Sequence, residues 1–438
     1  MKIVDNSRNV VVVGGGIAGI QAALDLADMG IHVHLIEKKP CIGGKMAQLD
    51  KTFPTLDCSI CILAPKLSEC YRHKNITIHT LSEVKNVKGE RGNFVIDVLK
   101  NPRYIKEDVC TGCGDCSRVC PVRGVYNYFD VNLTTQAAAY IPFPSAVPPV
   151  YLIDGEKCAY INYGICELCV KACGAEAIDF NQKEELISIK NINSVILATG
   201  YDLAEFENPL RGYGYKKCKN VITALEFERL ICASGPLGGH LKRLSDGKEP
   251  KKIAFIQCVN SRSYKAKQYC SSICCMYSAK EAMIAHEHDN ELESYIFYID
   301  VRAGNKGFQK FINRGETEYN IRYVKSKIAQ IKTDAQQNPI IVYEDFESAK
   351  IKKLKVDLAV LATCIIPPDG IEELANIFKI DLNKYNFIKT DPFYPVLTSR
   401  EGIYTCGCVH EPMDIPRSVA EASGAAAKAA ESVREVEI

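Results

Sequence analysis

The sequence of 438 residues contains no apolar run of about 18 or more residues, the length that a membrane-spanning helix needs. It also lacks an excess of charge, because 54 Lys and Arg residues stand against 53 Asp and Glu residues. The net charge therefore does not predict binding to nucleic acid or to an anionic membrane surface. Residues 1–9 are polar, and the apolar run 10–13 leads directly into glycines, so we expect no signal peptide. These absences predict a cytoplasmic protein.

Cysteine, by contrast, is abundant, with 21 residues. In a reducing compartment, clustered cysteines are better explained as metal ligands or redox thiols than as structural disulfides. The length and the 47% hydrophobic content predict two or three domains, each with its own core, rather than a small scaffold held by disulfides.

The order of predicted elements is α/β. Apolar runs predict strands at 10–13, 31–37, 194–200, 252–257, 295–301, 358–362 and 402–405, and helical spacing predicts helices at 17–29, 272–288 and 417–433. Dense cysteines and a proline-rich loop at 141–150 interrupt this pattern, which predicts an insertion. The expected segments are a first α/β part (1–100), the insertion (101–182), a continuation of the first part (183–250), a second α/β domain (251–362) and a closing segment (363–438).

A glycine motif predicts a Rossmann-type nucleotide site at the first strand. Gly14, Gly16 and Gly19 satisfy G-x-G-x-x-G between a predicted strand and a predicted helix. Gly14 permits the tight turn, Gly16 lets the backbone approach a pyrophosphate, and Gly19 allows close packing of helix and strand. Glu37, at the end of the next strand, is placed to accept hydrogen bonds from ribose hydroxyls.

The motif alone leaves FAD and NAD open, but further segments favour FAD. Residues 42–45 and 198–201 resemble the second and third dinucleotide contacts of two-domain flavoprotein disulfide reductases, and residues 402–407 resemble their flavin-closing segment. The acidic residue usual after that strand is replaced by Cys408, Val409 and His410, although a helix N-terminus near Arg417 could stabilise a reduced flavin. The further expected FAD-binding residues are Lys38, Gly43, Gly44, Lys45, Thr199, Gly200 and Gly407.

Two cysteine runs predict two 4Fe-4S clusters. The first, Cys110-x-x-Cys113-x-x-Cys116-x-x-x-Cys120-Pro121, is the bacterial ferredoxin pattern, in which the fourth cysteine ligates the other cluster. The second run has a longer first gap, and Gly174 takes the place of the proline. By this logic one cluster is held by Cys110, Cys113, Cys116 and Cys173, and the other by Cys158, Cys166, Cys169 and Cys120.

A third group, Cys258, Cys270, Cys274 and Cys275, fits no common ferredoxin spacing, and spacing alone leaves buried structural thiols as an equal alternative. Its position is more informative. The strand 252–257 would open a nicotinamide domain, yet residues 257–262 contain no glycine that would admit a pyrophosphate. A nucleotide site is therefore predicted to be lost, with four cysteines at the place where the nucleotide would enter. Segment 251–362 is thus expected to be a degenerate nicotinamide-type domain, segment 101–182 a ferredoxin-like domain, and segments 1–100, 183–250 and 363–438 the parts of an FAD-binding domain.

Together these residues resemble the A-type polypeptide of heterodisulfide reductase, the flavin and iron-sulfur protein of methanogenic archaea and related anaerobes. The segments that carry the resemblance are 43–50, 53–61, the inserted ferredoxin and 269–275. The resemblance implies a thioredoxin-reductase-like flavin core, FAD, and three 4Fe-4S clusters, the third on the last cysteine group beside FAD. It also implies that Lys280 lies near the flavin as a catalytic cation, whereas spacing alone favours a solvated lysine on a helix face.

The resemblance implies an electron-transfer component of a cytoplasmic complex, with flavin-based electron bifurcation between a two-electron donor, ferredoxin and a disulfide or other acceptor. The implied partners are B-type and C-type subunits, together with ferredoxin or an electron-delivering part of a hydrogenase or formate dehydrogenase, in a dimer of heteromers. Full-length family members carry further N-terminal and C-terminal domains, so we expect a short form.

Two rival functions stay open. One is a self-contained NAD(P)H-dependent flavin oxidoreductase of the glutamate synthase small-subunit type, against which the missing glycine loop argues. The other is a non-catalytic conduit or scaffold with a structural flavin.

The remaining cysteines are less specific. Cys58 and Cys61 are a redox dithiol, a buried pair, or part of a family-specific packing around the flavin. Cys406 and Cys408 are expected to meet the flavin. Core positions are expected for Cys41, Cys70, Cys218, Cys232 and Cys364.

Overall fold

The computed structural model describes residues 8–204 and 212–434. Most of the polar start of the chain, on which the signal-peptide expectation rests, lies outside these residues. The chain divides into two compact units: residues 1–47, 62–201 and 367–438 form the first, and residues 48–61 and 202–366 form the second. Residues 202–204 and 212–250 thus belong to the second unit, whereas the sequence analysis placed them in the segment 183–250, a continuation of the first part.

The first unit is built on a seven-stranded sheet in the order β3-β2-β1-β10-β5-β4, with β21 paired to β10. Its strands are β1 (Asn9–Val13), β2 (His32–Ile36), β3 (Ile76–His79), β4 (Ser82–Lys88), β5 (Phe94–Lys100), β10 (Glu185–Leu197) and β21 (Ile403–Thr405). The valines of β1 are buried throughout because neighbours pair with it on both sides. The continuous apolar run that predicted this strand is thereby explained.

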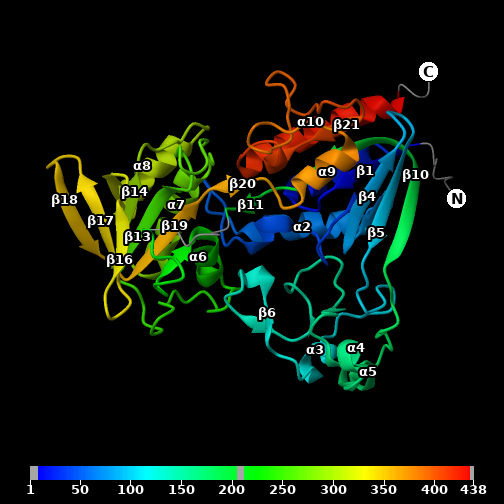
Figure 1. Cartoon of the computed structure of the whole chain (residues 1–438), viewed down its shortest axis with the longest axis horizontal. Helices are drawn as coiled ribbons and strands as arrows, with labels where there is room; N and C mark the ends of the chain where they lie inside the picture. Colours follow the sequence, from blue (N-terminus) through cyan, green and yellow to red (C-terminus); the bar gives the residue numbers. More distant parts are fainter. Residues whose placement is uncertain (1–7, 205–211, 435–438) are drawn as a thin grey trace. The chain divides into compact units, whose positions relative to one another are not determined.

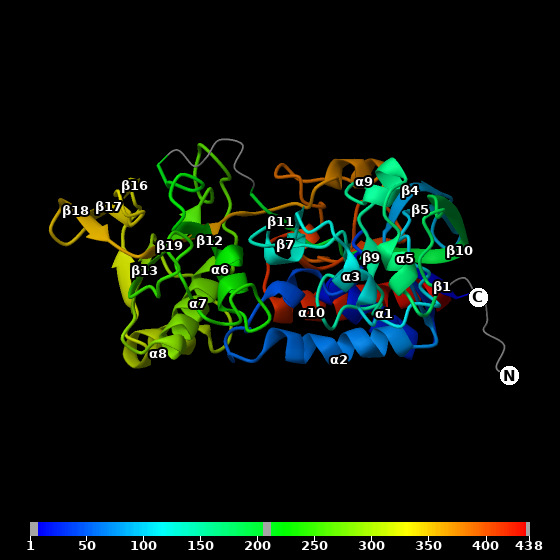
Figure 2. The same ribbon diagram turned by 90° about the horizontal axis from the view of Figure 1, so that it is seen from below.

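Helices cover this sheet. They are α1 (Ile17–Asp28), α2 (Ser59–Arg72), α9 (Ile371–Phe378) and α10 (Ile415–Arg434), with short 3-10 turns at Gly44–Gln48 and Gly407–Val409. Helices α1 and α10 pack side by side, and α10 also contacts β10 and β21 (Figure 2). The predicted helices at 17–29 and 417–433 are therefore confirmed within two residues at each end.

The predicted insertion lies between β5 and β10 and forms short elements only. These are α3 (Asp115–Val119), β6 (Val125–Tyr126), Tyr128–Asp130 as a 3-10 turn, β7 (Thr135–Gln136), β8 (Ala139–Tyr140), β9 (Leu152–Ile153), α4 (Ala159–Tyr163) and α5 (Leu168–Ala172). Helices α3, α4 and α5 gather at one end of it (Figure 1). Its small core contains Ile105, Val150 and Ile153 together with cysteine side chains, so cysteines occupy places that apolar residues fill elsewhere.

The second unit contains a five-stranded parallel sheet in the order β12-β19-β13-β14-β15. Its elements are β11 (Asp202–Leu203), β12 (Val221–Thr223), α6 (Ala224–Ile231), β13 (Lys252–Val259), α7 (Cys274–His288), β14 (Glu293–Tyr298), α8 (Phe308–Glu318), β15 (Arg322–Lys325), β16 (Gln330–Thr333), β17 (Pro339–Asp345), β18 (Lys350–Lys355), β19 (Leu358–Thr363) and β20 (Ile365–Ile366). Strands β16 to β18 form a separate antiparallel meander, seen in yellow in Figure 1.

The two units repeat one topology. In the first, β1, α1, β2 and β3 are followed by a meander, after which β10 returns to the other side of β1. In the second, β13, α7, β14, α8 and β15 are followed by a meander, after which β19 returns to the other side of β13. The turn after β13 therefore corresponds in topology to the glycine turn after β1, where parallel sheets of this kind bind nucleotides.

No helix in the described ranges is both long and apolar enough to span a membrane.

Candidate cofactor sites

The glycine turn after β1 leaves room only where a phosphate would need it. Gly14 has a φ of +106°, and a Cβ there would lie 2.3 Å from the Ala198 carbonyl oxygen. A Cβ on Gly19 would lie 1.8 Å from the Gly14 carbonyl oxygen, so the helix and the turn touch at this point. At Gly16, in contrast, a Cβ would meet nothing within 4 Å. This open space at the N-terminus of α1 fits a pyrophosphate.

Glu37 follows β2, as the sequence predicted, and it braces the glycine turn. One carboxylate oxygen accepts from the Gly15 N–H at 2.6 Å, and the other accepts from the Lys39 N–H at 2.8 Å. Burial raises the pKa of Glu37, and these backbone hydrogen bonds oppose that shift. The Glu37 carboxylate can accept further hydrogen bonds beside these two. Its predicted contact with ribose hydroxyls is therefore still possible and stays a prediction. Neighbouring Lys38 is exposed and pairs with Glu83 at 3.9 Å.

The second and third predicted dinucleotide segments adjoin this turn. The Gly43 N–H donates to the Gly15 carbonyl at 2.7 Å, and a Cβ on Gly44 would lie 2.9 Å from the Gly16 Cα. The buried Thr199 hydroxyl has no hydrogen-bond partner in the described part of the chain. Gly200 follows with a φ of +73°, and the Lys45 ammonium lies 5.3 Å from the Tyr201 ring. An orphaned hydroxyl beside an open glycine turn suits a polar ligand such as FAD.

The flavin-closing segment has an acidic residue that sequence reasoning missed. Gly407 has a φ of +73°, and its N–H lies 3.4 Å from a carboxylate oxygen of Glu421. The same oxygen lies 2.7 Å from His410 Nε2. Glu421 sits within α10, so only the packing of that helix reveals it. Asp414 accepts from the Arg417 N–H at 2.8 Å and thereby caps the helix N-terminus that was expected to face the flavin.

The first predicted cluster site lies in the insertion around α3. Burial raises the pKa of Cys116 to about 12, and the charges of Cys110 and Cys113 act on it in the same direction. Cys110 and Cys173 pack against the core that contains Cys116, and α3 contacts α5, from which Cys173 follows. Three of the four predicted ligands thus lie at one small core, whereas Cys113 is exposed.

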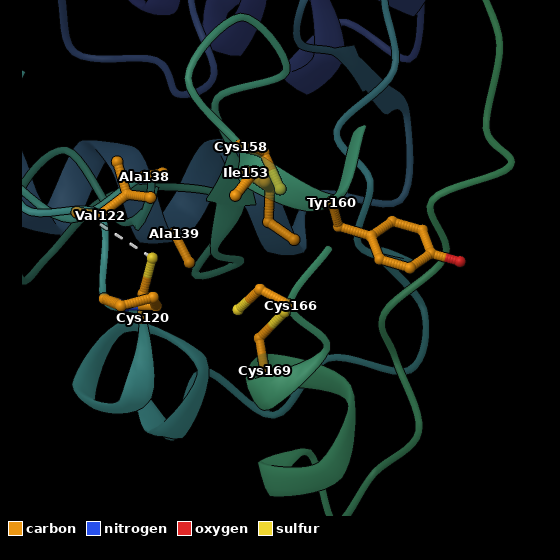
Figure 3. A pocket seen from close by; sticks show the side chains of 11 residues that line it. Cys120, Val122, Ala138, Ala139, Ile153, Cys158, Tyr160, Cys166 and Cys169 are labelled. Carbon is orange, nitrogen blue, oxygen red and sulfur yellow. Dashed lines mark hydrogen bonds between the residues drawn. The ribbon is translucent and has the colours of Figure 1, made fainter. Parts of the chain in front are cut away.

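The second predicted set surrounds one cavity. Its four cysteines, Cys120, Cys158, Cys166 and Cys169, line the cavity together with the apolar residues Val122, Ala138, Ala139 and Ile153 (Figure 3). Burial raises the pKa of Cys169 to about 11, with further contributions from Cys158 and Cys120. Cys158, whose spacing departs from the ferredoxin pattern, lies in the same cavity as its expected partners.

Each of these two donor sets offers four thiols, the number that a four-iron cluster takes. Among residues 8–204 and 212–434, no three His, Cys, Asp or Glu side chains converge closely enough for one metal ion. A four-iron cluster takes one thiolate on each of its irons, which suits cysteines spread around a space. Ligation by thiolates would release the protons that these buried cysteines retain at their raised pKa values.

The third set lies at the carboxyl end of β13, in the loop that follows it and at the start of α7. Cys258 is buried with a φ of +60°, and Cys274 and Cys275 begin α7. Burial raises the pKa of Cys258 to about 11, and the charges of Cys275 and Cys270 also raise it. All four thiols therefore interact within one turn. Their ligation of a cluster stays a prediction.

The backbone at the end of β13 and just after it is left-handed at three residues other than glycine. Cys258, Asn260 and Arg262 all have positive φ angles, at 60°, 59° and 54°. Each carries a side chain where a nucleotide-binding turn would use glycine. The Arg262 N–H donates to the Tyr269 carbonyl at 3.0 Å, and Ser261 Oγ donates to the same carbonyl at 2.6 Å, so the two ends of the turn are joined.

Lys280 is not a solvated surface lysine. Its side chain is 1% exposed, pairs with the buried carboxylate of Glu228, and donates to the Lys51 carbonyl at 3.0 Å. Glu281 is also buried, and desolvation raises its pKa well above the usual glutamate value, with Glu228 adding to the shift. The alternative interpretation of Lys280 as solvated is therefore wrong, while its proximity to a flavin stays a prediction.

Burial confirms the expected core cysteines, Cys41, Cys70, Cys218, Cys232 and Cys364, and also places Cys406 and Cys408 inside the protein. Cys58 and Cys61 form a disulfide bond.

Comparison with known proteins places these features in a family. Residues 9–55 match the family model for FAD dependent oxidoreductases. The A-type iron-sulfur polypeptide of the CoB--CoM heterodisulfide reductase of Methanocaldococcus jannaschii is 45% identical over 430 residues, 97% of this chain and 64% of that protein. The A-type polypeptide of the H(2):CoB-CoM heterodisulfide,ferredoxin reductase of Methanothermobacter thermautotrophicus is 44% identical, over 96% of this chain and 63% of that protein. The chain thus spans less than two thirds of these relatives.

Among solved structures, thioredoxin reductases share the fold. The enzyme of Lactococcus lactis has a TM-score of 0.53 at 15% identity and covers 98% of this chain and 99% of that one. The enzyme of T. acidophilum has a TM-score of 0.52 at 16% identity with the same coverage. These likenesses confirm the predicted Rossmann-type, thioredoxin-reductase-like fold.

Proposed function

Because this chain belongs to the A-type family of heterodisulfide reductase polypeptides, we propose that it is the FAD and iron-sulfur electron-transfer component of a cytoplasmic heterodisulfide-reductase-like complex. When bound, FAD would take up electrons in pairs, and the clusters would carry them singly. The chain's own residues would supply the binding sites: the glycine turn with Thr199 for FAD, and the three cysteine sets for iron.

The observation that carries the proposal is the turn after β13. In topology this turn corresponds to the glycine turn of the first unit. The four cysteines lie in and around it, and three residues other than glycine, Cys258 among them, have positive φ angles there. A nicotinamide cofactor needs close backbone approach at this point, which side chains prevent. The arrangement supports a cluster as the electron-exchange site in place of a hydride donor.

Relatives guide the proposal for partners. The names of these relatives include ferredoxin, H2 or formate, and F420H2 as reactants of the CoB-CoM heterodisulfide reductases to which they belong. We propose B-type and C-type subunits as neighbours of this chain. Its proposed electron source is ferredoxin or the electron-delivering part of a hydrogenase or formate dehydrogenase. We further propose that the flavin bifurcates electrons, passing those of a two-electron donor to ferredoxin and to a disulfide or other acceptor.

Lys280 is the proposed catalytic cation. Its charge is held by Glu228 in a buried setting, where water screens a charge weakly. A fixed buried cation of this kind would favour an anionic reduced flavin.

Metal and flavin content test the proposal directly. Anaerobically purified protein should contain about twelve iron atoms, about as much acid-labile sulfide, and about one FAD per chain, from three four-iron sites. Replacing Cys275 by Ser should remove about four of these iron atoms and leave the FAD content unchanged. Cys232→Ser is the matched control, because Cys232 is buried in the same unit but belongs to no cysteine set. A wild-type content of about eight iron atoms would rule out the third site.

A further inference from the structure

Cys58 and Cys61 belong to none of the three cysteine sets, and they are bonded to each other. Their Cα atoms are 5.2 Å apart, and both lie in the segment 48–61 of the second unit. Cys61 is exposed and Cys58 is half-buried, so the interpretation of these residues as a buried structural pair is wrong. An accessible disulfide at C-x-x-C spacing is open to exchange with thiols.

The start of α2 makes the two sulfurs chemically unequal. Cys58 directly precedes the helix, and the Cys61 N–H lies 3.3 Å from the Cys58 sulfur, to which it donates. This N–H and the helix N-terminus would stabilise negative charge on Cys58. Cys58 is therefore the better leaving thiolate, whereas Cys61 offers the sulfur that an incoming nucleophile can reach.

The surrounding loop holds Cys58 in place. Lys51 and Cys58 are paired as a β-bridge, and the Ser59 N–H donates to the Asp50 carbonyl at 2.9 Å. The Lys51 ammonium pairs with Glu287 on α7 at 2.6 Å. A backbone fixed in this way would keep the two cysteines within bonding reach after the disulfide opens, which favours reversible exchange.

Further along α2, Pro65 lies four residues, about one helical turn, after Cys61. Proline has no N–H, so the helix cannot supply the usual hydrogen bond to the Cys61 carbonyl. The first turn of the helix, which carries the exposed sulfur, is thus less firmly bound than the loop that carries Cys58.

We propose that Cys58 and Cys61 form a thiol-disulfide exchange site for low-molecular-weight thiols. A thiolate attacks the Cys61 sulfur, a mixed disulfide forms there, and Cys58 leaves as a thiolate. A second thiolate attacks the small molecule's sulfur in the mixed disulfide, which releases the small-molecule disulfide and the Cys61 thiolate. The two protons lost by the small thiols are taken up by Cys58 and Cys61, so two thiols are oxidised as one protein disulfide is reduced.

A small thiol is the favoured reactant because only one of the two sulfurs is exposed. Neither FAD nor a cluster takes part in the exchange. The site is therefore independent of the proposed electron-transfer function, and each can fail without the other.

The sequence around the site allows a direct assay. Trypsin should release residues 52–66 as one peptide, which contains Cys58 and Cys61 and no other cysteine. The intact holoprotein is equilibrated anaerobically with graded ratios of reduced to oxidised glutathione, alkylated and digested. We expect the peptide to pass from disulfide to doubly alkylated dithiol as the ratio rises, while iron and FAD contents stay constant.

Single substitutions distinguish the accessible sulfur of Cys61 from the leaving sulfur of Cys58. In Cys58→Ser, Cys61 should attack oxidised glutathione, form a mixed disulfide and release one reduced glutathione. Cys61→Ser should form about tenfold less mixed disulfide on Cys58, because Cys58 is less accessible to oxidised glutathione. Cys70→Ser is the matched control, since Cys70 lies on the same helix with 0% exposure and should leave exchange unchanged.

Two outcomes would overturn the proposal. One is a peptide that stays in a single redox state at every glutathione ratio, with no adduct on Cys61 in the Cys58→Ser protein. The other is exchange with a protein dithiol such as reduced thioredoxin but not with glutathione, which would refute the assigned reactant class.

Discussion

At the scale of single residues, the buried charges around Lys280 carry the clearest consequence. Lys280 pairs with Glu228 rather than with its neighbour Glu281, which is buried in the same region. Desolvation and the charge of Glu228 raise the pKa of Glu281. The folded protein therefore holds a proton on Glu281 that the unfolded chain releases above the usual glutamate pKa.

This proton makes stability depend on pH. The folded state binds it more tightly, so the free energy of unfolding should fall as pH rises above about 5, by up to about 1.4 kcal/mol per pH unit. Glu281→Gln keeps a neutral hydrogen-bonding group without a titrating proton, so its stability should decline less between pH 5 and pH 8, a range of about three units. Chemical denaturation of the anaerobic holoprotein across this range measures the difference.

The control for that measurement is Glu291→Gln, because the Glu291 side chain is 81% exposed. Its pH profile should follow that of the wild type. Parallel profiles for wild type and Glu281→Gln would show that Glu281 is ionised in the folded protein, contrary to the expectation.

At the scale of elements, the insertion between β5 and β10 depends on its cysteines for a core. Its helices have only five residues each, too few to be stable alone, and its core mixes a few aliphatic side chains with cysteine thiols. The two Rossmann-type sheets, in contrast, have continuous aliphatic cores. Iron should therefore stabilise the insertion far more than it stabilises the sheets.

Removal of iron tests this difference. After anaerobic oxidation and chelation of iron, limited proteolysis should cut first between residues 104 and 180, and rates of cleavage there should rise by about tenfold or more. Peptide mapping by mass spectrometry locates the cuts, and the untreated holoprotein is the reference. Earlier cleavage within the sheets, or equal cleavage with and without iron, would contradict the proposed dependence.

At the scale of the whole molecule, one topology occurs twice with different turns. The first unit has glycines after β1, and the second has cysteines and positive-φ residues with side chains after β13. Since a Rossmann-type turn must let backbone approach a pyrophosphate, the chain should bind one dinucleotide and not two.

Titration with pyridine nucleotides checks this expectation. Holoprotein should show no saturable binding of NADH or NADPH at concentrations up to about 1 mM, the weak limit for a functional site. Its flavin absorbance should persist in their presence, whereas reduced ferredoxin or another low-potential donor should bleach it. Rapid bleaching by NADH or NADPH would instead support the self-contained flavin oxidoreductase.

The sequence by itself determined the features that depend on local pattern. The apolar run of β1, the glycine spacing after it and the ferredoxin spacing in the insertion each act over a few neighbouring residues. The fold class could therefore be predicted from them, and the cofactor sites could be proposed. Cys158 shows the same principle, because its place beside Cys120 followed from ferredoxin logic despite an unusual gap.

Only the tertiary structure decided what depends on residues far apart in the chain. It placed residues 48–61 with the second unit, buried Lys280 against Glu228, brought Glu421 to Gly407 and joined Cys58 to an exposed Cys61. Periodicity describes which face of a helix is apolar, but it does not state which distant group covers that face. Burial and pairing, which set the charge and reactivity of these side chains, arise only when the whole chain packs.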